Sequence, residues 1–136
     1  MKKDDCIFCK IANGEIPSNT IYEDENFRAI LDLGPATKGH ALILPKDHYK
    51  DLTELPEETA AAVMKLARQL TIRMMKNLNA DGLNIVQNNG EAAGQTVMHY
   101  HLHLIPRYTD DGANILWKPT EVTQEELAAV KNTIIA

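Results

Sequence analysis

Three of the chain's five histidines stand at every second position, at His99, His101 and His103. In a β-strand, residues two apart point to the same face, so these imidazoles would form one row. The side chains beside them are apolar or aromatic and would form the opposite face: Met98, Tyr100, Leu102 and Leu104. The spacing therefore predicts a strand with one apolar face and one face of imidazoles.

The spacing also limits what the histidines can do. A strand rises about 3.4 Å per residue, which puts His99 and His103 about 14 Å apart, too far to share one metal ion easily. The spacing still allows a metal ion between two adjacent histidines. It fits better with three histidines that have separate roles on one bound molecule. A core position for all three is disfavoured, because buried polar groups need partners.

Length and charge narrow the class of protein. The 136 residues fit a single domain, 1–136, with one hydrophobic core. The start of the chain lacks the apolar run of a secretory signal, and no stretch is long and apolar enough for a bilayer, so we expect a cytoplasmic protein with no membrane partner. The net charge of -5, without a basic cluster, argues against nucleic acid as a partner.

Apolar patterning predicts an α+β fold. Short strands are expected at 20–23, 27–32, 41–44 and 83–88, before the histidine strand. A long helix is expected over 56–78, since apolar residues recur there at helical spacing: Val63, Leu66, Ala67, Leu70, Met74 and Leu78. A capping box at Thr123 predicts a short closing helix. We expect a mainly antiparallel five-stranded sheet of meander type with the long helix across one face.

The only two cysteines, Cys6 and Cys9, form a C-x-x-C at the start of a short predicted helix. A redox pair of the thioredoxin kind needs a βαβ context, which this chain lacks. The alternatives are two thiols without a special role or one half of a zinc site, for which His48 and His99 are available as further ligands.

The segment Gly94-Gln95-Thr96-Val97-Met98-His99-Tyr100-His101-Leu102-His103 resembles the signature of the histidine triad (HIT) family of nucleotidyl hydrolases and transferases. Further matches cover nearly the whole chain: Cys6 to Ile11, Asp32, Gly39-His40, Pro45 to His48, and Asn88. The sequence looks closest to small bacterial HIT proteins, which resemble histidine triad nucleotide-binding proteins. The resemblance implies a HIT-like fold.

The resemblance also implies an activity and catalytic residues. The chain would bind a purine nucleotide or nucleotide conjugate and hydrolyse a nucleoside phosphoramidate, or a related conjugate, at the α-phosphorus. His101 would be the nucleophile, forming a covalent nucleotidyl-histidine. The backbone carbonyl of His99 would hold the tautomer of His101, and His103 would steady the phosphate oxygens.

Other site residues follow from the same resemblance. Asp32 would hold the ribose hydroxyls, although a carboxylate at the end of a strand can simply cap a turn. The remaining substrate-binding candidates lie in and before the turn that leads to the histidines: Asn88, Gly94, Gln95 and Thr96. Small bacterial members often hold structural zinc with the set that matches Cys6, Cys9, His48 and His99. Dimeric members send a C-terminal segment to the partner's active site, which makes a homodimer expected and Trp117 a candidate for that contact.

One departure leaves the leaving group open. After the triad the chain reads Leu104-Ile105-Pro106-Arg107, where phosphoramidases of the family usually carry a glycine pair before arginine and dinucleoside polyphosphate hydrolases often carry Pro-Arg. A dinucleoside polyphosphate hydrolase is therefore one alternative. A non-catalytic nucleotide-binding regulatory module is another.

Overall fold

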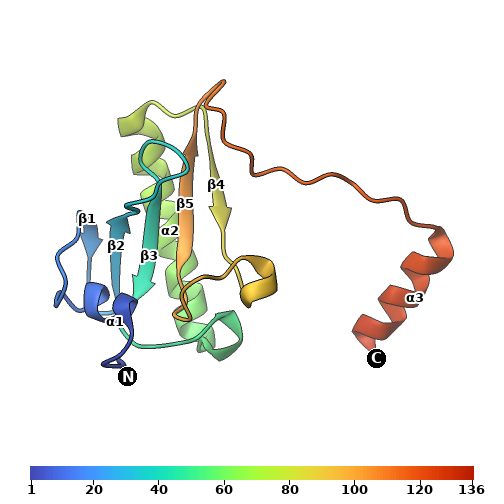
Figure 1. Ribbon diagram of the computed structural model, residues 1–136, viewed down its shortest axis with the longest axis horizontal. Helices are drawn as coiled ribbons and strands as arrows, with labels where there is room; N and C mark the ends of the chain where they lie inside the picture. Colours follow the sequence, from blue (N-terminus) through green and yellow to red (C-terminus); the bar gives the residue numbers. More distant parts are fainter.

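The computed structural model describes residues 1–136 and contains one five-stranded antiparallel sheet (Figure 1). Its strands are β1 (Thr20–Glu23), β2 (Phe27–Leu31), β3 (Ala41–Pro45), β4 (Gly82–Val86) and β5 (Leu102–Arg107). The predicted α+β class and the antiparallel five-stranded sheet are confirmed.

The strand order, β1-β2-β3-β5-β4, is a meander only over its first three strands. The helix between β3 and β4 brings the chain back to the end of the sheet at which β3 begins, so β4 runs parallel to β3 (Figure 1). β5 lies between them and is antiparallel to both. His103 on β5 is thereby central, opposite Leu42 on one side and Val86 on the other.

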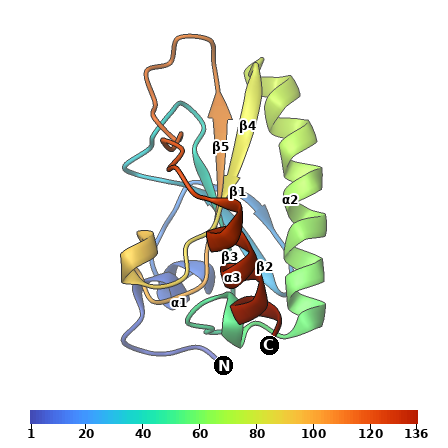
Figure 2. The ribbon, with the colours of Figure 1, turned by 90° about the vertical axis from the view of Figure 1, so that its right-hand side faces the viewer.

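Helix α2 (Glu57–Leu78) covers one face of the sheet (Figure 2). It begins after Pro56 and ends at Leu78, and the next residue, Asn79, adopts a left-handed conformation with φ 53°. The left-handed residue stops the helix because a helical turn cannot continue through it. Of the predicted apolar stripe, Leu78 is partly buried and five residues are buried in the main core: Val63, Leu66, Ala67, Leu70 and Met74.

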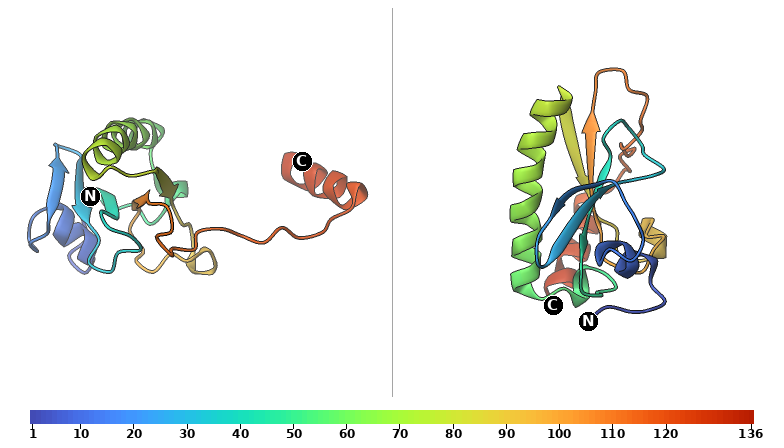
Figure 3. Two further views of the ribbon diagram at one scale, coloured as in Figure 1. Left: turned by 90° about the horizontal axis from the view of Figure 1, so that it is seen from above. Right: turned by 90° about the vertical axis from the view of Figure 1, so that its left-hand side faces the viewer.

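Helix α1 (Ile7–Ala12) lies on the other face of the sheet, opposite α2 (Figure 2; Figure 3, right). Its Ala12 belongs to a second, smaller core with Ile30, Leu42 and Leu44, against which Phe8 and Ile11 pack. The sheet therefore has apolar contacts on both faces, and the face toward α1 also carries the imidazoles.

The C-terminal part leaves the body of the molecule. Residues 108–123 contain no helix or strand, and α3 (Gln124–Ile135) lies away from the sheet (Figure 1; Figure 3, left). Its predicted cap is present, since the Thr123 hydroxyl accepts the Glu126 N–H at 3.1 Å. The predicted C-terminal helix is therefore confirmed, and its apolar residues Leu127, Val130 and Ile134 are exposed. None of the helices combines the length and apolarity needed to cross a membrane.

Candidate active site

The histidine segment keeps its alternation although only part of it is a strand. β5 begins at Leu102, so His99 and His101 lie in the irregular segment before it. Tyr100 and Leu102 enter the core under α2 as expected, while Met98 is exposed, contrary to expectation. Hydrophobic burial on one face is enough to maintain the alternation without complete strand pairing.

The tautomer of His101 is determined by a backbone carbonyl. Its Nδ1 lies 2.7 Å from the His99 oxygen, and a carbonyl can only accept, so Nδ1 carries the proton. Nε2 is left with a free lone pair. Burial lowers the pKa of His101 below its ordinary value, which keeps the ring neutral near pH 7. The Phe8 ring packs edge-on against it, with centroids 5.0 Å apart.

His103 receives its tautomer from His40. The Ala36 N–H donates to His40 Nδ1 at 2.9 Å, so the proton of His40 is on Nε2. That Nε2 lies 2.9 Å from His103 Nδ1 and donates to it, which places the proton of His103 on Nε2. Burial lowers the pKa of His103 to about 4, so this ring is neutral as well. His101 thus presents a lone pair on Nε2, and His103 presents an N–H on Nε2. The centroids of the two rings are 5.0 Å apart.

Asp32 completes this group but does not make it a suitable metal site. Its Oδ2 is 3.7 Å from His40 Nε2, and its Oδ1 accepts the Gly34 N–H at 2.8 Å. A metal on His40 Nε2 would have to replace the only proton of that ring, because Nδ1 already accepts from Ala36. Imidazolate formation is costly, so the arrangement favours a hydrogen-bonded chain over a metal ion.

The two histidines open into a cavity of about 430 Å³ between α1 and the sheet. Its polar lining residues are Ser18, Asn19, Asp32, Thr96, His101 and His103. Its other part is mainly apolar, with side chains of α1, of the following segment and of the strands: Ile7, Phe8, Ile11, Ile16, Pro17, Ile30, Leu31, Leu33 and Leu42. One part of the cavity is therefore apolar, and the part at the imidazoles is polar.

The turn before the histidines is held by Gln95, whose side chain was expected to help bind substrate. Its amide donates to the backbone oxygens of Lys50 and Val97, at 2.7 and 3.0 Å, and accepts the Gly90 N–H at 2.8 Å. With its amide bound to three backbone groups, the Gln95 side chain braces the turn, and its part in substrate binding stays a prediction.

The other turn candidates lie close together near the cavity. The Asn88 amide is 3.5 Å from the Gly94 oxygen, and Gly94 has a φ of 98°, which favours glycine. Thr96 is exposed and lines the cavity beside His101 and His103. Asn88 therefore supports the turn that brings Thr96 to the imidazoles.

The predicted metal ligands converge at the start of α1. The ligand atoms of Cys6, Cys9, His48 and His99 all lie within 4.8 Å of one another, and both sulfurs are 3.4 Å from His99 Nδ1. His99 Nε2 lies 2.9 Å from the Pro45 oxygen and donates to it, so Nδ1 offers its lone pair to the cluster. Two sulfurs and two imidazole nitrogens are a donor set that fits tetrahedral zinc.

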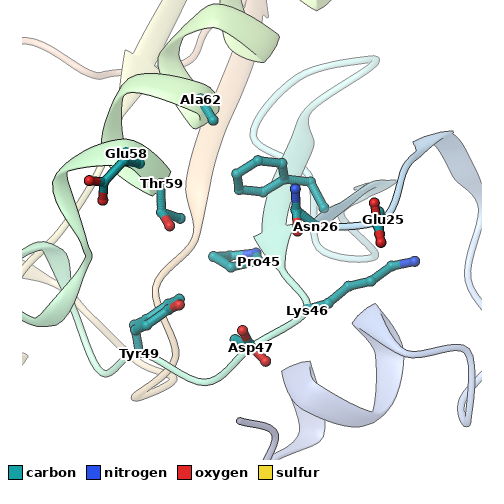
Figure 4. Close-up of a pocket in the computed structure, with 10 residues that line it drawn as sticks. Glu25, Asn26, Pro45, Lys46, Asp47, Tyr49, Glu58, Thr59 and Ala62 are labelled. Carbon is teal, nitrogen blue, oxygen red and sulfur yellow. The ribbon is translucent and has the colours of Figure 1, made fainter.

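A second cavity, of about 340 Å³, lies between the turn after β1 and the start of α2 (Figure 4). It contains none of the predicted site residues. Two of its charged groups are already paired: Lys46 with Glu23 at 2.7 Å, and Asp47 with the N-terminal amine at 3.1 Å. The histidine cavity is the better candidate.

Two residues of the site were missed by sequence reasoning. His40 was noted only as part of a family match, and Phe8 only within the N-terminal match, yet they contact His103 and His101 respectively. The signal for His40 was a polar residue directly before a fully apolar strand, where an imidazole needs a partner.

Comparison with known families and proteins gives consistent matches. The HIT domain family model matches residues 13–110. The chain is 40% identical to "Protein hit" of Bacillus subtilis over 96% of this chain and 92% of that protein. It is 37% identical to "Adenosine 5'-monophosphoramidase hnt1" of Schizosaccharomyces pombe over 95% of each. It is also 39% identical to "Adenylylsulfatase HINT3" of Arabidopsis thaliana, over 92% of this chain and 62% of that protein.

Solved structures show the same fold. A Streptococcus mutans protein superimposes with a TM-score of 0.93 at 41% identity, over 98% of this chain and 85% of that chain. A zinc-bound histidine triad family protein from Mycobacterium smegmatis superimposes with a TM-score of 0.77 at 40% identity, over 95% and 97%.

Proposed function

Because this chain belongs to the HIT family, we propose that it is a nucleotide-binding hydrolase that cleaves a nucleoside phosphoramidate, or a related nucleotide conjugate, at the α-phosphorus. The observation that carries the proposal is the pair of opposite tautomers: His101 offers a lone pair and His103 an N–H to one cavity. A nucleophile beside a hydrogen-bond donor is what attack on a phosphoryl group requires.

We assign a purine nucleotide to this cavity, with its base at the apolar residues and its phosphate at the imidazoles. The apolar compartment around Phe8 and Ile30 takes the base, the Asp32 carboxylate accepts from the ribose hydroxyls, and the α-phosphate meets the imidazoles. Thr96 adds a hydroxyl at the phosphate. This order, from apolar to anionic, matches the order of groups along a nucleotide.

The reaction takes two steps. His101 Nε2 attacks the α-phosphorus, the bond to the leaving group breaks, and a nucleotidyl-histidine forms. The His99 carbonyl, which accepts the Nδ1–H of His101, stabilises the positive charge that develops on the ring. The Nε2–H of His103 donates to the phosphoryl group. Water then attacks phosphorus and releases the nucleotide and free His101.

We also propose that Cys6, Cys9, His48 and His99 hold a structural zinc ion. Four protein ligands leave no open position for substrate, so the ion would hold the start of α1 against the histidine segment. The zinc-bound relative from Mycobacterium smegmatis supports this assignment. His99 would serve both sites, with its side chain on the metal and its carbonyl on His101.

The function is tested by offering the purified protein an adenosine phosphoramidate and, separately, a dinucleoside tetraphosphate. We expect faster cleavage of the phosphoramidate and transient addition of one nucleotidyl group in intact-mass spectra. Faster cleavage of the tetraphosphate would favour the polyphosphate alternative. Binding of mononucleotide without cleavage of either compound would favour a regulatory module.

Arg107 of the Pro-Arg sequence is engaged in contacts within the chain. The guanidinium binds both oxygens of Asp111, at 2.8 and 3.0 Å, and also the Asn84 side chain and the Ala113 carbonyl. The Pro-Arg sequence therefore has a structural use here, anchoring the segment that follows β5.

Asp32→Ala is expected to raise KM for ribonucleotide substrates about tenfold or more, with a much smaller effect on 2′-deoxy analogues. An ionised carboxylate loses most when both hydroxyls are present to donate. Steady-state kinetics on matched ribose and deoxyribose substrates measures the difference. Asp32→Asn is the control, because its amide oxygen can still accept the Gly34 N–H that Asp32 binds at 2.8 Å. Equal losses on both sugars would mean that Asp32 only caps the turn.

We further propose a homodimer in which the C-terminal segment packs on the partner. Leu116 and Trp117 are 83% and 84% exposed, and the apolar residues of α3 are uncovered as well. Apolar patches of this kind mark interaction surfaces. The segment leaves the body of the molecule next to the Arg107–Asp111 ion pair. It is therefore directed away from its own sheet and free to reach a second copy.

A chain that ends after Ala113 lacks this segment and is expected to sediment as a monomer at concentrations where the full chain is a dimer. Removal of Leu116, Trp117 and α3 takes away the apolar area that the proposal assigns to the interface. Sedimentation velocity of both proteins over a concentration series gives the result. A monomeric full chain at all concentrations, or an unchanged dimer after truncation, would contradict the proposal.

A further inference from the structure

The two cysteines at the start of α1 differ in exposure but face each other. Cys6 caps the helix, with its sulfur accepting the Cys9 N–H at 3.3 Å, and it is partly exposed. Cys9 is buried, and its sulfur accepts the Lys3 N–H at 3.3 Å. The two sulfurs lie within 4.8 Å of each other. One thiol is thus open to a small reagent, and the other is positioned to react with its product.

We propose that the Cys6–Cys9 pair is an oxidative modification site, at which a hydroperoxide forms a disulfide and thereby releases the zinc ion. The inference rests on the zinc site of the proposed function. It goes beyond the proposed function because it names a class of reagent, hydroperoxides. It also assigns to the cysteines a reversible modification that plays no part in the hydrolytic reaction.

The two sulfurs supply both electrons, and the hydroperoxide accepts them. A bound zinc ion would hold both cysteines as thiolates. The Cys6 thiolate attacks the peroxide, forming an S–O bond as the O–O bond breaks and hydroxide or alkoxide leaves. The Cys9 thiolate attacks the sulfur of that sulfenic acid, forming the S–S bond and expelling hydroxide. Two electrons pass from the sulfurs to the peroxide, and Zn²⁺ departs.

A disulfide and the metal are geometrically incompatible. Two sulfurs at about 2.3 Å from tetrahedral zinc are about 3.8 Å apart, whereas a disulfide brings them to about 2.05 Å. The disulfide sulfurs also carry no charge for the metal. His48 and His99 are then the only ligands left, so the ion is released.

Oxidation of the two cysteines affects His101 through its contacts with Phe8 and His99. Phe8 stands between the two cysteines in the chain, and its ring lies 5.0 Å from His101 and 6.1 Å from His99, centroid to centroid. His99 offers its side chain to the metal and its carbonyl to His101 Nδ1, 2.7 Å away. Loss of the metal and movement of Cys6 and Cys9 therefore loosen both contacts of His101. Ligand-supporting contacts of this kind affect activity about 10- to 100-fold.

The test measures zinc and thiols first and activity second. Zinc-loaded protein is treated with hydrogen peroxide while a chromophoric chelator reports free zinc and a thiol reagent counts free cysteines. We expect one zinc released for every two thiols lost. Cleavage after Lys3 and Lys10 gives one peptide with both cysteines, which should lack two hydrogen atoms. Dithiothreitol plus zinc should restore the starting state.

Cys6→His is the matched control, since it retains one sulfur and three imidazoles as ligands but cannot form the disulfide. It should keep zinc under the same treatment, and if it fails to load zinc, the peptide mass and thiol count of the unmodified chain still decide. Retention of zinc and both thiols in excess peroxide would overturn the proposal. Oxidation to sulfinic acid without a disulfide would also overturn it.

The hydrolytic readout tests the link between the two sites separately. We expect kcat for a phosphoramidate to fall about tenfold on oxidation and to recover with reductant and zinc. An unchanged kcat in protein that has lost zinc would overturn the link to His101. Zinc content before oxidation distinguishes these results from failure of the proposed function, because a protein without zinc refutes the metal site and a protein without hydrolase activity refutes the reaction.

Discussion

His101→Ala is expected to lose turnover by at least about a thousandfold while mononucleotide affinity stays within about tenfold of the parent. The reason is that Nε2 of His101 provides the attacking lone pair, whereas base and ribose binding rest on the apolar compartment and on Asp32. Single-turnover kinetics and equilibrium binding, run on the same preparation, separate the two effects. The nucleotidyl adduct in intact-mass spectra should disappear together with turnover.

A second substitution, His101→Gly, distinguishes loss of the nucleophile from a disturbed structure. His101→Gly leaves a space beside the Phe8 ring, into which free imidazole can diffuse and supply the missing nucleophile. We expect added imidazole to restore measurable turnover in the glycine variant. Turnover in His101→Ala near the parent rate would end the assignment of His101 as the nucleophile.

Loss of zinc is expected to produce the largest effect on stability. Cys9→Ser should purify without zinc, and its melting temperature should fall by about 10 °C or more, because a metal held only by the folded chain contributes directly to folding free energy. Cys9 is fully buried, and its sulfur lies 3.4 Å from the nitrogens of both His48 and His99. Removal of zinc from the parent chain with a chelator should lower the melting temperature similarly.

Metal content in three variants identifies the residues that hold the ion. Cys6→Ser and Cys9→Ser should lack zinc, and His103→Ala should retain one zinc per chain, because His103 hydrogen-bonds to His40 and not to the cysteines. Thermal melts and elemental analysis of the same samples provide both readouts. If zinc persisted without the cysteines and disappeared with His103, the ion would lie on the histidine face. The covalent mechanism would then have to be abandoned.

Periodicity in the sequence predicted most of the helices and strands and most of their buried residues, although β5 begins only at Leu102 and Met98 is exposed. The 3.6-residue spacing of Val63, Leu66 and Leu70 predicted the buried stripe of α2, and the period of two around His101 predicted which side chains enter the core. These patterns are local, because the geometry of a helix or strand repeats within a few residues and burial selects one face. The helix cap at Thr123 could be predicted from the sequence because it, too, is a local pattern.

Only part of the candidate site could be predicted from the sequence. Resemblance to the HIT family suggested that Cys6, Cys9, His48 and His99 come together, and the structure brings their ligand atoms within 4.8 Å. The sequence did not reveal that the Gln95 amide is occupied by backbone groups, or that His40 sets the tautomer of His103. Hydrogen bonds of this kind join residues 45 and 63 positions apart.

Tertiary structure decided the features that depend on distant segments meeting. The position of β5 between β3 and β4 follows from the path of α2 across the sheet, which no local pattern encodes. The amphipathic pattern of α3 predicted a helix correctly but not a contact, since an apolar face specifies burial without specifying the partner surface. Local sequence determines the conformation of a segment, whereas its neighbours are determined by packing, which depends on the whole chain and on any second copy that it meets.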